Sequence, residues 1–290
     1  MNLRLASVLL VLFGTVLTGC ATMAPAAPAA KPVILLDFES APLGVITGEY
    51  ALSGNEVAPE GTKVLPKKFG RDAAGKPTDG PEVVAGGRSG KQSLSVQSGR
   101  RSEGLVVDLP EALDASQPFP PGSVTIEFVF QTRGLNPAGN AFGFQYLGGN
   151  EWPNGGRFSW SFRTAVDQVL NFVSFHGGRE TRLPVKEQIV ADKWYHVAGV
   201  LDYNTAKPEE SVLRFYLEGK LLDEKPYDAS KDTGALMGSN TTYGNGFSVG
   251  YSYGQDANGG DNRGLDGLID AVAVTLQALG PGQFVLAKKP

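Results

Sequence analysis

The chain is poor in cysteine, histidine and net positive charge. Its 290 residues include one cysteine and two histidines. A single cysteine excludes an intrachain disulfide framework, and with two histidines it leaves a Cys/His zinc site almost without ligands. The 26 basic residues are outnumbered by 30 acidic ones, which gives a formal net charge of -4. Because no basic field is present to attract a phosphate backbone, we expect no nucleic-acid partner.

Long hydrophobic runs are also scarce, and the one at the amino terminus is too short to span a membrane. Residues 5–16 form an apolar run after Arg4, with the length of a signal-peptide core. The next residues, Leu17-Thr18-Gly19-Cys20, resemble the lipobox of bacterial lipoproteins, in which the peptidase cuts before a lipid-modified cysteine. We therefore expect a signal peptide over 1–19 and a lipidated Cys20. The alternative is an ordinary secretory signal with an incidental cysteine.

Residues 20–32 predict a tether. They are a low-complexity Ala/Pro segment that cannot bury apolar surface and should stay extended. Two or more acyl chains on Cys20 would give stable membrane anchoring. Residue 21 is Ala rather than Asp, and resemblance to sorted lipoproteins then implies the outer membrane of a Gram-negative cell. We expect a lipid-anchored protein of the bacterial cell envelope.

The remaining residues, 33–290, lack helical periodicity and predict one all-β domain. Short runs of period two, bounded by Gly, Pro, Asn or Asp, are typical of strands. In the run 124–131, Val124, Ile126, Phe128 and Phe130 share one face and the other face is largely polar, which indicates an antiparallel β-sandwich. The predicted strands are 33–38, 92–97, 104–109, 124–132, 142–147, 157–163, 169–175, 180–185, 194–201, 212–217, 246–251 and 267–276.

Some local features have structural interpretations. The polar stretch 49–80 predicts a long loop region or a small excursion from the sheets, and we assign its lysines no role. His196 lies in an apolar strand and is interpreted as a buried, hydrogen-bonded side chain rather than a catalytic one. Trp194, at the start of the same strand, should supply a large buried surface. Glu218-Gly219 predicts a tight hairpin, because glycine tolerates positive φ.

Four ordered segments resemble the LamG-like jelly rolls of the concanavalin A-like lectin/glucanase superfamily. Residues 86–96 are similar to the entry strand of that family. Residues 122–130 are similar to its later strand with the pattern FTIEFWV. Residues 192–222 resemble its Trp/His strand and the hairpin that follows, and 247–251 with 265–274 resemble its ending. The resemblance covers most of 33–284 and implies a concanavalin A-like jelly roll. This scaffold carries lectins, enzymes and adhesion modules alike.

No catalytic residue is assigned. Glycoside hydrolases of this superfamily use a Glu-x-Asp-x-x-Glu strand, because alternate residues place two carboxylates on one open face. The chain has no such pattern, and neither histidine follows a Gln by two residues as a jelly-roll lyase would need. The leading hypothesis is a non-catalytic module that binds a glycan or polysaccharide. A divergent glycoside hydrolase or polysaccharide lyase, and a structural or protein-interaction lipoprotein, remain alternatives.

Loop aromatics are the candidate ligand-binding residues, because sugar faces stack on aromatic rings and hydroxyls pair with Asn, Asp and Arg. Trp152, beside Asn150, lies in a turn-rich loop where an exposed ring has little structural reason. A second polar-aromatic cluster contains Tyr243, Tyr251, Tyr253, Asp261 and Arg263. The alternative is that these rings fold down over the core.

The resemblance also implies a structural Ca²⁺ where the first strand meets the last, held by an Asp of the final strand. Asp270 matches that position, and Asp37 or Glu39 would join it. Carboxylate oxygens suit this hard cation. The alternative is that Asp270 caps a turn or pairs with an arginine. No other cofactor is expected.

Overall fold

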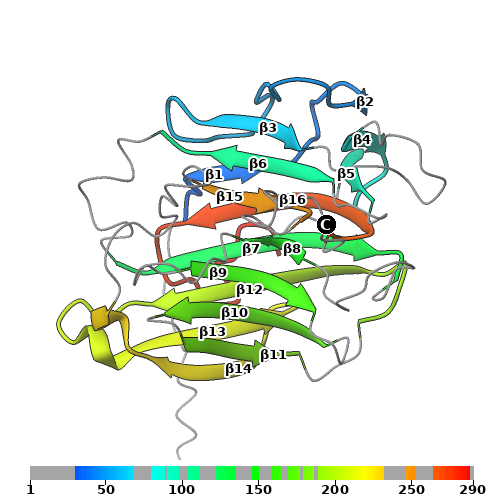
Figure 1. Cartoon of the computed structure of the whole chain (residues 1–290). Coiled ribbons are helices and arrows are strands. Elements are labelled where there is room, and N and C mark those ends of the chain that lie inside the picture. The colour runs from blue at the N-terminus through cyan, green and yellow to red at the C-terminus, as the bar shows by residue number, and fades with distance from the viewer. Residues whose placement is uncertain are drawn as a thin grey trace, which may run out of the picture.

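The computed structural model of the chain describes residues 30–67, 80–88, 90–97, 103–110, 122–134, 146–149, 159–164, 169–176, 179–185, 189–231, 246–251 and 264–287. These residues form sixteen strands and two 3₁₀ turns, η2 (Pro208–Glu210) and η3 (Ala229–Lys231), with no α-helix among them. The strands build two antiparallel sheets that stack as a sandwich (Figure 1). The all-β jelly-roll fold predicted from the sequence is confirmed. The described part of the chain contains no helix long and apolar enough to cross a bilayer.

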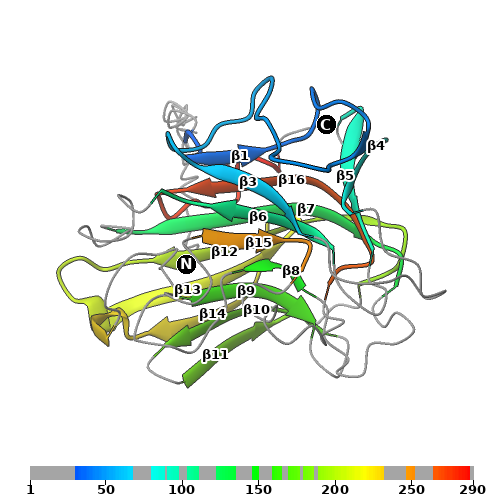
Figure 2. The ribbon, with the colours of Figure 1, turned by 45° about the horizontal axis from the view of Figure 1, so that its top comes forward.

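Sheet A has nine strands in the order β14-β13-β12-β7-β16-β5-β4-β2, and β1 pairs with β16 as the ninth. Figure 2 shows β1 beside β16, the contact between the first and last strands that the family resemblance implied. The bounds are β1 (Ile34–Leu36), β2 (Gly44–Val45), β4 (Glu82–Ala85), β5 (Gln92–Val96), β7 (Val124–Thr132), β12 (Trp194–Asp202), β13 (Ser211–Leu217), β14 (Lys220–Tyr227) and β16 (Gly267–Thr275).

Sheet B has seven strands in the order β11-β10-β9-β8-β15-β6-β3. The bounds are β3 (Lys63–Lys67), β6 (Gly104–Asp108), β8 (Tyr146–Gly149), β9 (Ser159–Thr164), β10 (Leu170–His176), β11 (Arg179–Pro184) and β15 (Gly246–Val249).

The core between the sheets combines aliphatic side chains with a group of aromatic rings. Phe128 of sheet A meets Phe162 of sheet B edge-on, with ring centroids 5.4 Å apart, and Trp160 lies 5.5 Å from Phe247. The Val124, Ile126, Phe128 and Phe130 face of β7 is fully buried, as the alternation predicted. Each such side chain contributes about 1.5–3 kcal/mol when removed from water, so this row anchors the two sheets to each other.

The other face of β7 is buried too, which the sequence did not predict. Residues 276–287, here called the C-terminal strap, follow β16 and pack across the outer face of sheet A. Leu279 and Phe284 of the strap pack against Val200 and Tyr216, and Leu286 packs against Val129. Sheet A therefore lies between the main core and a second apolar layer.

The stretch 49–80 contains a strand, which was not among the predicted strands. Strand β3 occupies Lys63–Lys67 and pairs with β6 at the edge of sheet B. Lysine and proline are common on sheet edges, because they block pairing with a further strand. Lys63, Pro66 and Lys67 gave this strand a polar appearance that concealed it.

The hairpin at Glu218-Gly219 is confirmed. It joins β13 to β14, and both turn residues have positive φ, 51° at Glu218 and 74° at Gly219. A two-residue turn with positive φ at both positions matches the right-handed twist of the flanking strands. This turn places the Glu218 side chain at the end of β12 that carries Trp194.

Candidate functional site

Two of the three predicted calcium ligands, Asp270 and Glu39, bind one loop between β4 and β5. Oδ1 of Asp270 accepts the backbone N–H of Arg88 at 3.0 Å, and Oε2 of Glu39 accepts the backbone N–H of Lys91 at 2.8 Å. Oδ1 of Asp37 accepts the backbone N–H of Glu39 at 3.4 Å. Two carboxylates from opposite ends of the chain thus hold the same loop.

Asp270 reaches this loop because β16 is irregular there. Its neighbours Ile269 and Ala271 pair with the consecutive residues Phe130 and Val129 of β7, which leaves Asp270 as the extra residue of a β-bulge. The loop also needs its glycines: a Cβ at Gly87 would collide with the Asp270 carboxylate. Glycine at position 87 therefore lets the backbone of this loop approach the Asp270 carboxylate closely.

This donor set fits calcium in type but not in number. Ca²⁺ takes six to eight oxygen ligands, including carboxylates, backbone carbonyls and water. The described residues contain no group of three or more His, Cys, Asp or Glu side chains arranged to hold a metal ion. The hydrogen bond from the Arg88 N–H to Asp270 agrees with the alternative interpretation, in which Asp270 caps a turn. Calcium at Asp270, Asp37 and Glu39 stays a prediction.

Beside the loop, an ion pair crosses the outer face of sheet A. The Arg88 guanidinium meets the Glu218 carboxylate with two hydrogen bonds, 3.1 Å from Nη1 to Oε1 and 2.7 Å from Nη2 to Oε2. The Glu218 carboxylate also accepts the backbone N–H of His196 at 2.7 Å. The pair is therefore fixed at both ends, yet it stays open to solvent, with 28% of the Arg88 and 41% of the Glu218 side chain exposed.

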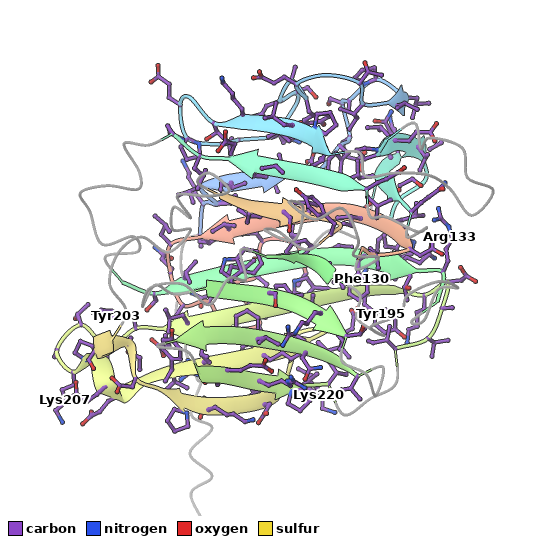
Figure 3. All side chains as sticks on the ribbon, viewed as in Figure 1. Phe130, Arg133, Tyr195, Tyr203, Lys207 and Lys220 are labelled. Atoms are coloured by element: carbon purple, nitrogen blue, oxygen red, sulfur yellow. The ribbon has the colours of Figure 1, made fainter. Side chains whose placement is uncertain are left out.

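Trp194 lies on this same outer face. Its neighbour Tyr195 points inward and its ring is 5.9 Å from that of Phe130, so Trp194 and its cross-strand partner Gln131 point outward. Figure 3 labels Phe130 and Tyr195 at one end of the sandwich. Trp194 packs against the cluster that includes Val129 and remains partly exposed, so its surface is less buried than the sequence indicated.

Most of the predicted ligand-binding residues lie outside the described residues, as does the predicted lipidation site. They are Cys20, Asn150, Trp152, Tyr243, Tyr253, Asp261 and Arg263. Tyr251 is described, and its side chain is only 1% exposed. A buried ring matches the alternative that this aromatic residue folds down into the protein, and it offers no stacking face to a sugar in this conformation.

Glu127, His196 and Thr125 form a buried polar cluster under the strap, and the sequence did not predict that they meet. Oε2 of Glu127 lies 3.0 Å from Nε2 of His196 and accepts the backbone N–H of Leu286, while Oε1 accepts that of Val285. Thr125 adds two hydrogen bonds, one to the carbonyl of Gln277 and one from the N–H of residue 279. The interpretation of His196 as buried and hydrogen-bonded is confirmed, and its partner Glu127 holds the strap.

The strands of sheet B carry two acidic residues, which lie far apart. Asp108 is two residues after the outward-facing Val106 on β6, so it faces outward as well. Glu180 is on β11. Five strand steps separate β6 from β11, which is about 24 Å at the usual strand spacing. The Glu180 carboxylate is bound by Arg163 at 2.7 Å and also by Arg182. A glycosidase needs its two carboxylates within about 5–10 Å, so these two acids cannot act as such a pair.

Solved structures with a similar fold include toxin binding domains. The botulinum neurotoxin serotype D/C VPI 5993 binding domain matches 87% of this chain and 50% of its own length, with a TM-score of 0.52 and 11% identity. The binding domain of botulinum neurotoxin DC in complex with rat synaptotagmin II matches 83% and 49%, with a TM-score of 0.50 and 12% identity. The chain thus spans about half the length of these structures, and at such low identity the likeness concerns the fold alone.

A sialidase module of Ruminococcus gnavus, the IT-sialidase CBM40 bound to α2,3 sialyllactose, matches 65% of this chain and 91% of its own length. Its TM-score is 0.41 and its identity 15%. No curated protein sequence matches the chain. The family model of the concanavalin A-like lectin/glucanases superfamily matches residues 107–283, which are 177 of the 290 residues. The chain therefore belongs to the concanavalin A-like lectin/glucanases superfamily.

Proposed function

We propose that this chain is a non-catalytic carbohydrate-binding protein, tethered by lipid to the bacterial cell envelope. The observation that carries the binding function is its membership of a superfamily of lectins and glucanases, combined with the placement of acids in sheet B. A glucanase would need a close pair of carboxylates on one face. The Asp108 and Glu180 positions are five strands apart, so the sheet favours binding over hydrolysis.

Three acidic residues of sheet A, Glu127, Asp202 and Glu224, make contacts that stabilise the fold. Glu127 is covered by the C-terminal strap and accepts two backbone N–H groups of that strap. Asp202 and Glu224 both pair with Arg214, at 2.7 Å and 2.5 Å. Burial lowers the pKa of Arg214, but its hydrogen bonds to these two carboxylates outweigh that effect, and the pKa is raised overall. A carboxylate held by a permanent cation is a poor general base.

The lipid anchor is proposed from the sequence Leu17-Thr18-Gly19-Cys20 and the Ala/Pro tether that follows. Metabolic labelling with a fatty acid in a Gram-negative host tests it. We expect the label on the wild-type chain and in the outer-membrane fraction, and none on Cys20→Ser. Equal labelling of Cys20→Ser, or a wild-type chain free in the periplasm, would remove the anchor from the proposal.

A glycan array tests carbohydrate binding. The chain from residue 21 onward is applied in calcium and in EDTA, because the predicted metal would make binding calcium-dependent. We expect concentration-dependent binding to a related set of glycans. A blank array in both conditions, from protein with a cooperative melting transition, would contradict the function and favour a structural or protein-interaction role.

A further inference from the structure

The outer face of sheet A carries a second, unpredicted candidate for the glycan contact. We propose that Trp194, Gln131 and the Arg88–Glu218 ion pair form a surface that binds neutral, hydroxyl-rich sugars. This inference rests on the proposed carbohydrate-binding function and names a site for it. The loop aromatics predicted from the sequence have no part in it.

Trp194 lies at the open end of the outer face of β12. Residues further along the outward face of β12 are buried under the C-terminal strap, as Ala198 and Val200 are. Trp194 lies at the start of the strand, packs one side against the cluster of Val129 and Leu286, and keeps part of its surface exposed. A large aromatic ring with one face supported by the protein and another toward solvent is suited to stacking on an apolar sugar face.

Polar side chains lie near the Trp194 ring on the same face. Glu218 bonds the backbone N–H of His196, which is two residues, or about 7 Å, along the strand from Trp194. Arg88 bonds Glu218 in the two-point geometry that fixes both planar groups. Gln131, the cross-strand partner of Trp194, donates from Nε2 to the carbonyl of Asp192 at 2.8 Å. These planar groups offer both donors and acceptors to sugar hydroxyls.

The surface is preorganised by hydrogen bonds to its backbone. The backbone of Arg88 is held by the buried Asp270, and Lys91 of the same loop by Glu39. Because these groups are fixed before a ligand arrives, little ordering entropy opposes binding. Asp270 and Glu39 therefore have a role that needs no metal, because they position the loop that carries the Arg88 side chain.

The charge of the surface selects the ligand class. Arg88 and Glu218 neutralise each other, so the site presents no net charge to a ligand. A uronate or sialic acid would gain no net attraction from this pair, because its carboxylate would be repelled by that of Glu218. Neutral hexose polymers meet no such repulsion, and their hydroxyls can bond both members of the pair.

Tryptophan fluorescence tests the inference on the whole folded chain. The chain has three tryptophans, and Trp160 is fully buried, so acrylamide quenching reports on the other two. In Trp152→Phe, quenching reports on Trp194. The probes are maltohexaose, cellohexaose, laminarihexaose and chitohexaose, with polygalacturonate as the anionic comparison. We expect at least one neutral probe to protect Trp194 from quenching, and polygalacturonate not to.

Binding variants complete the test. Trp194→Ala and Arg88→Ala should weaken binding of the protecting probe by about tenfold or more, while Lys207→Ala should not. Lys207 is exposed and lies at the other end of the sandwich from Tyr195 (Figure 3). Should Trp194→Ala fail to fold, Arg88→Ala decides, because it removes only a solvent-exposed ion pair. Wild-type binding that persists in both variants would overturn this site and leave the proposed function standing. No binding by the wild-type chain to any probe or array glycan would overturn both.

Discussion

Nε2 of His196 lies 3.0 Å from Oε2 of Glu127, and both side chains are fully buried between sheet A and the C-terminal strap. The Glu127 carboxylate also accepts two strap N–H groups, so three donors meet one carboxylate. With Thr125 and His196, this carboxylate forms the polar part of the second layer, which is apolar elsewhere. It ties the last described residues of the chain to the central strand of the larger sheet.

Removing that carboxylate should destabilise the protein strongly. In Glu127→Ala, the strap N–H groups and the His196 ring lose a buried acceptor, which costs about 3–5 kcal/mol of unfolding free energy. Urea denaturation measures the loss. Glu209→Ala, an exposed acid in η2, is the control and should change stability by less than about 0.5 kcal/mol. Equal stability of the two variants would show that the strap does not depend on Glu127.

Strand β12 should not tolerate a methyl group at Gly199. A Cβ there would collide with the Phe172 ring of the opposite sheet, whereas a Cβ at Gly48 would meet no atom within 4 Å. We expect Gly199→Ala to lose about 1–3 kcal/mol by overpacking. Gly48→Ala should be neutral or slightly stabilising, because it restricts the unfolded chain. Similar unfolding midpoints for both variants would contradict the tight packing between β12 and β10.

The stability of the fold should fall at high pH through Tyr50. Burial, the charge of Glu56 and the hydrogen bond to Glu56 raise the pKa of the Tyr50 hydroxyl above its ordinary value of 10.0. Above pH 10 the unfolded chain therefore releases a proton that the folded chain retains, and the free energy of unfolding decreases as pH rises. One such group contributes a slope of at most about 1.4 kcal/mol per pH unit. Tyr50→Phe should flatten the curve between pH 10 and 11, and parallel curves would contradict the assignment.

Calcium binding and loop anchoring at Asp270 can be separated with Asp270→Asn. Asparagine keeps an oxygen that accepts the Arg88 N–H but loses the charge that a cation needs. If calcium binds, the wild-type melting temperature should rise with calcium and fall with EDTA, and the variant should not respond. The variant should match the wild type in EDTA. A wild-type melting temperature indifferent to calcium and EDTA would remove the metal and leave Asp270 as a loop anchor.

Elements were predicted correctly from the sequence where their side-chain pattern fits only one type of local structure. Strand β7 was predicted with its observed bounds, Val124–Thr132, because four alternate apolar residues can share only one face of a strand. The Glu218-Gly219 turn was equally clear, since few residues tolerate positive φ. The edge strand β3 was missed because Lys63, Pro66 and Lys67 protect an edge with the same residue types that mark loops.

The site was predicted less well because its parts meet only in three dimensions. Arg88 and Glu218 are 130 residues apart in sequence, and Glu127 lies 158 residues before Val285, which it holds. Neither contact has a local signal. Asp270 was found through family resemblance, but its place on a bulge required the register of β16 against β7. Trp194 was expected at the rim of the main core, but it packs against the outer cluster of Val129 and Leu286. The first residue of a strand does not reveal which of the two layers it joins.

We propose that the chain binds a carbohydrate and does not cleave it. Titration of the wild-type chain with its strongest array glycan, followed by chain-length analysis of the recovered glycan, tests both halves together. We predict saturable binding and a recovered glycan of unchanged length after prolonged incubation. A shortened or unsaturated product would identify a hydrolase or a lyase, and an absence of saturation would contradict carbohydrate binding itself.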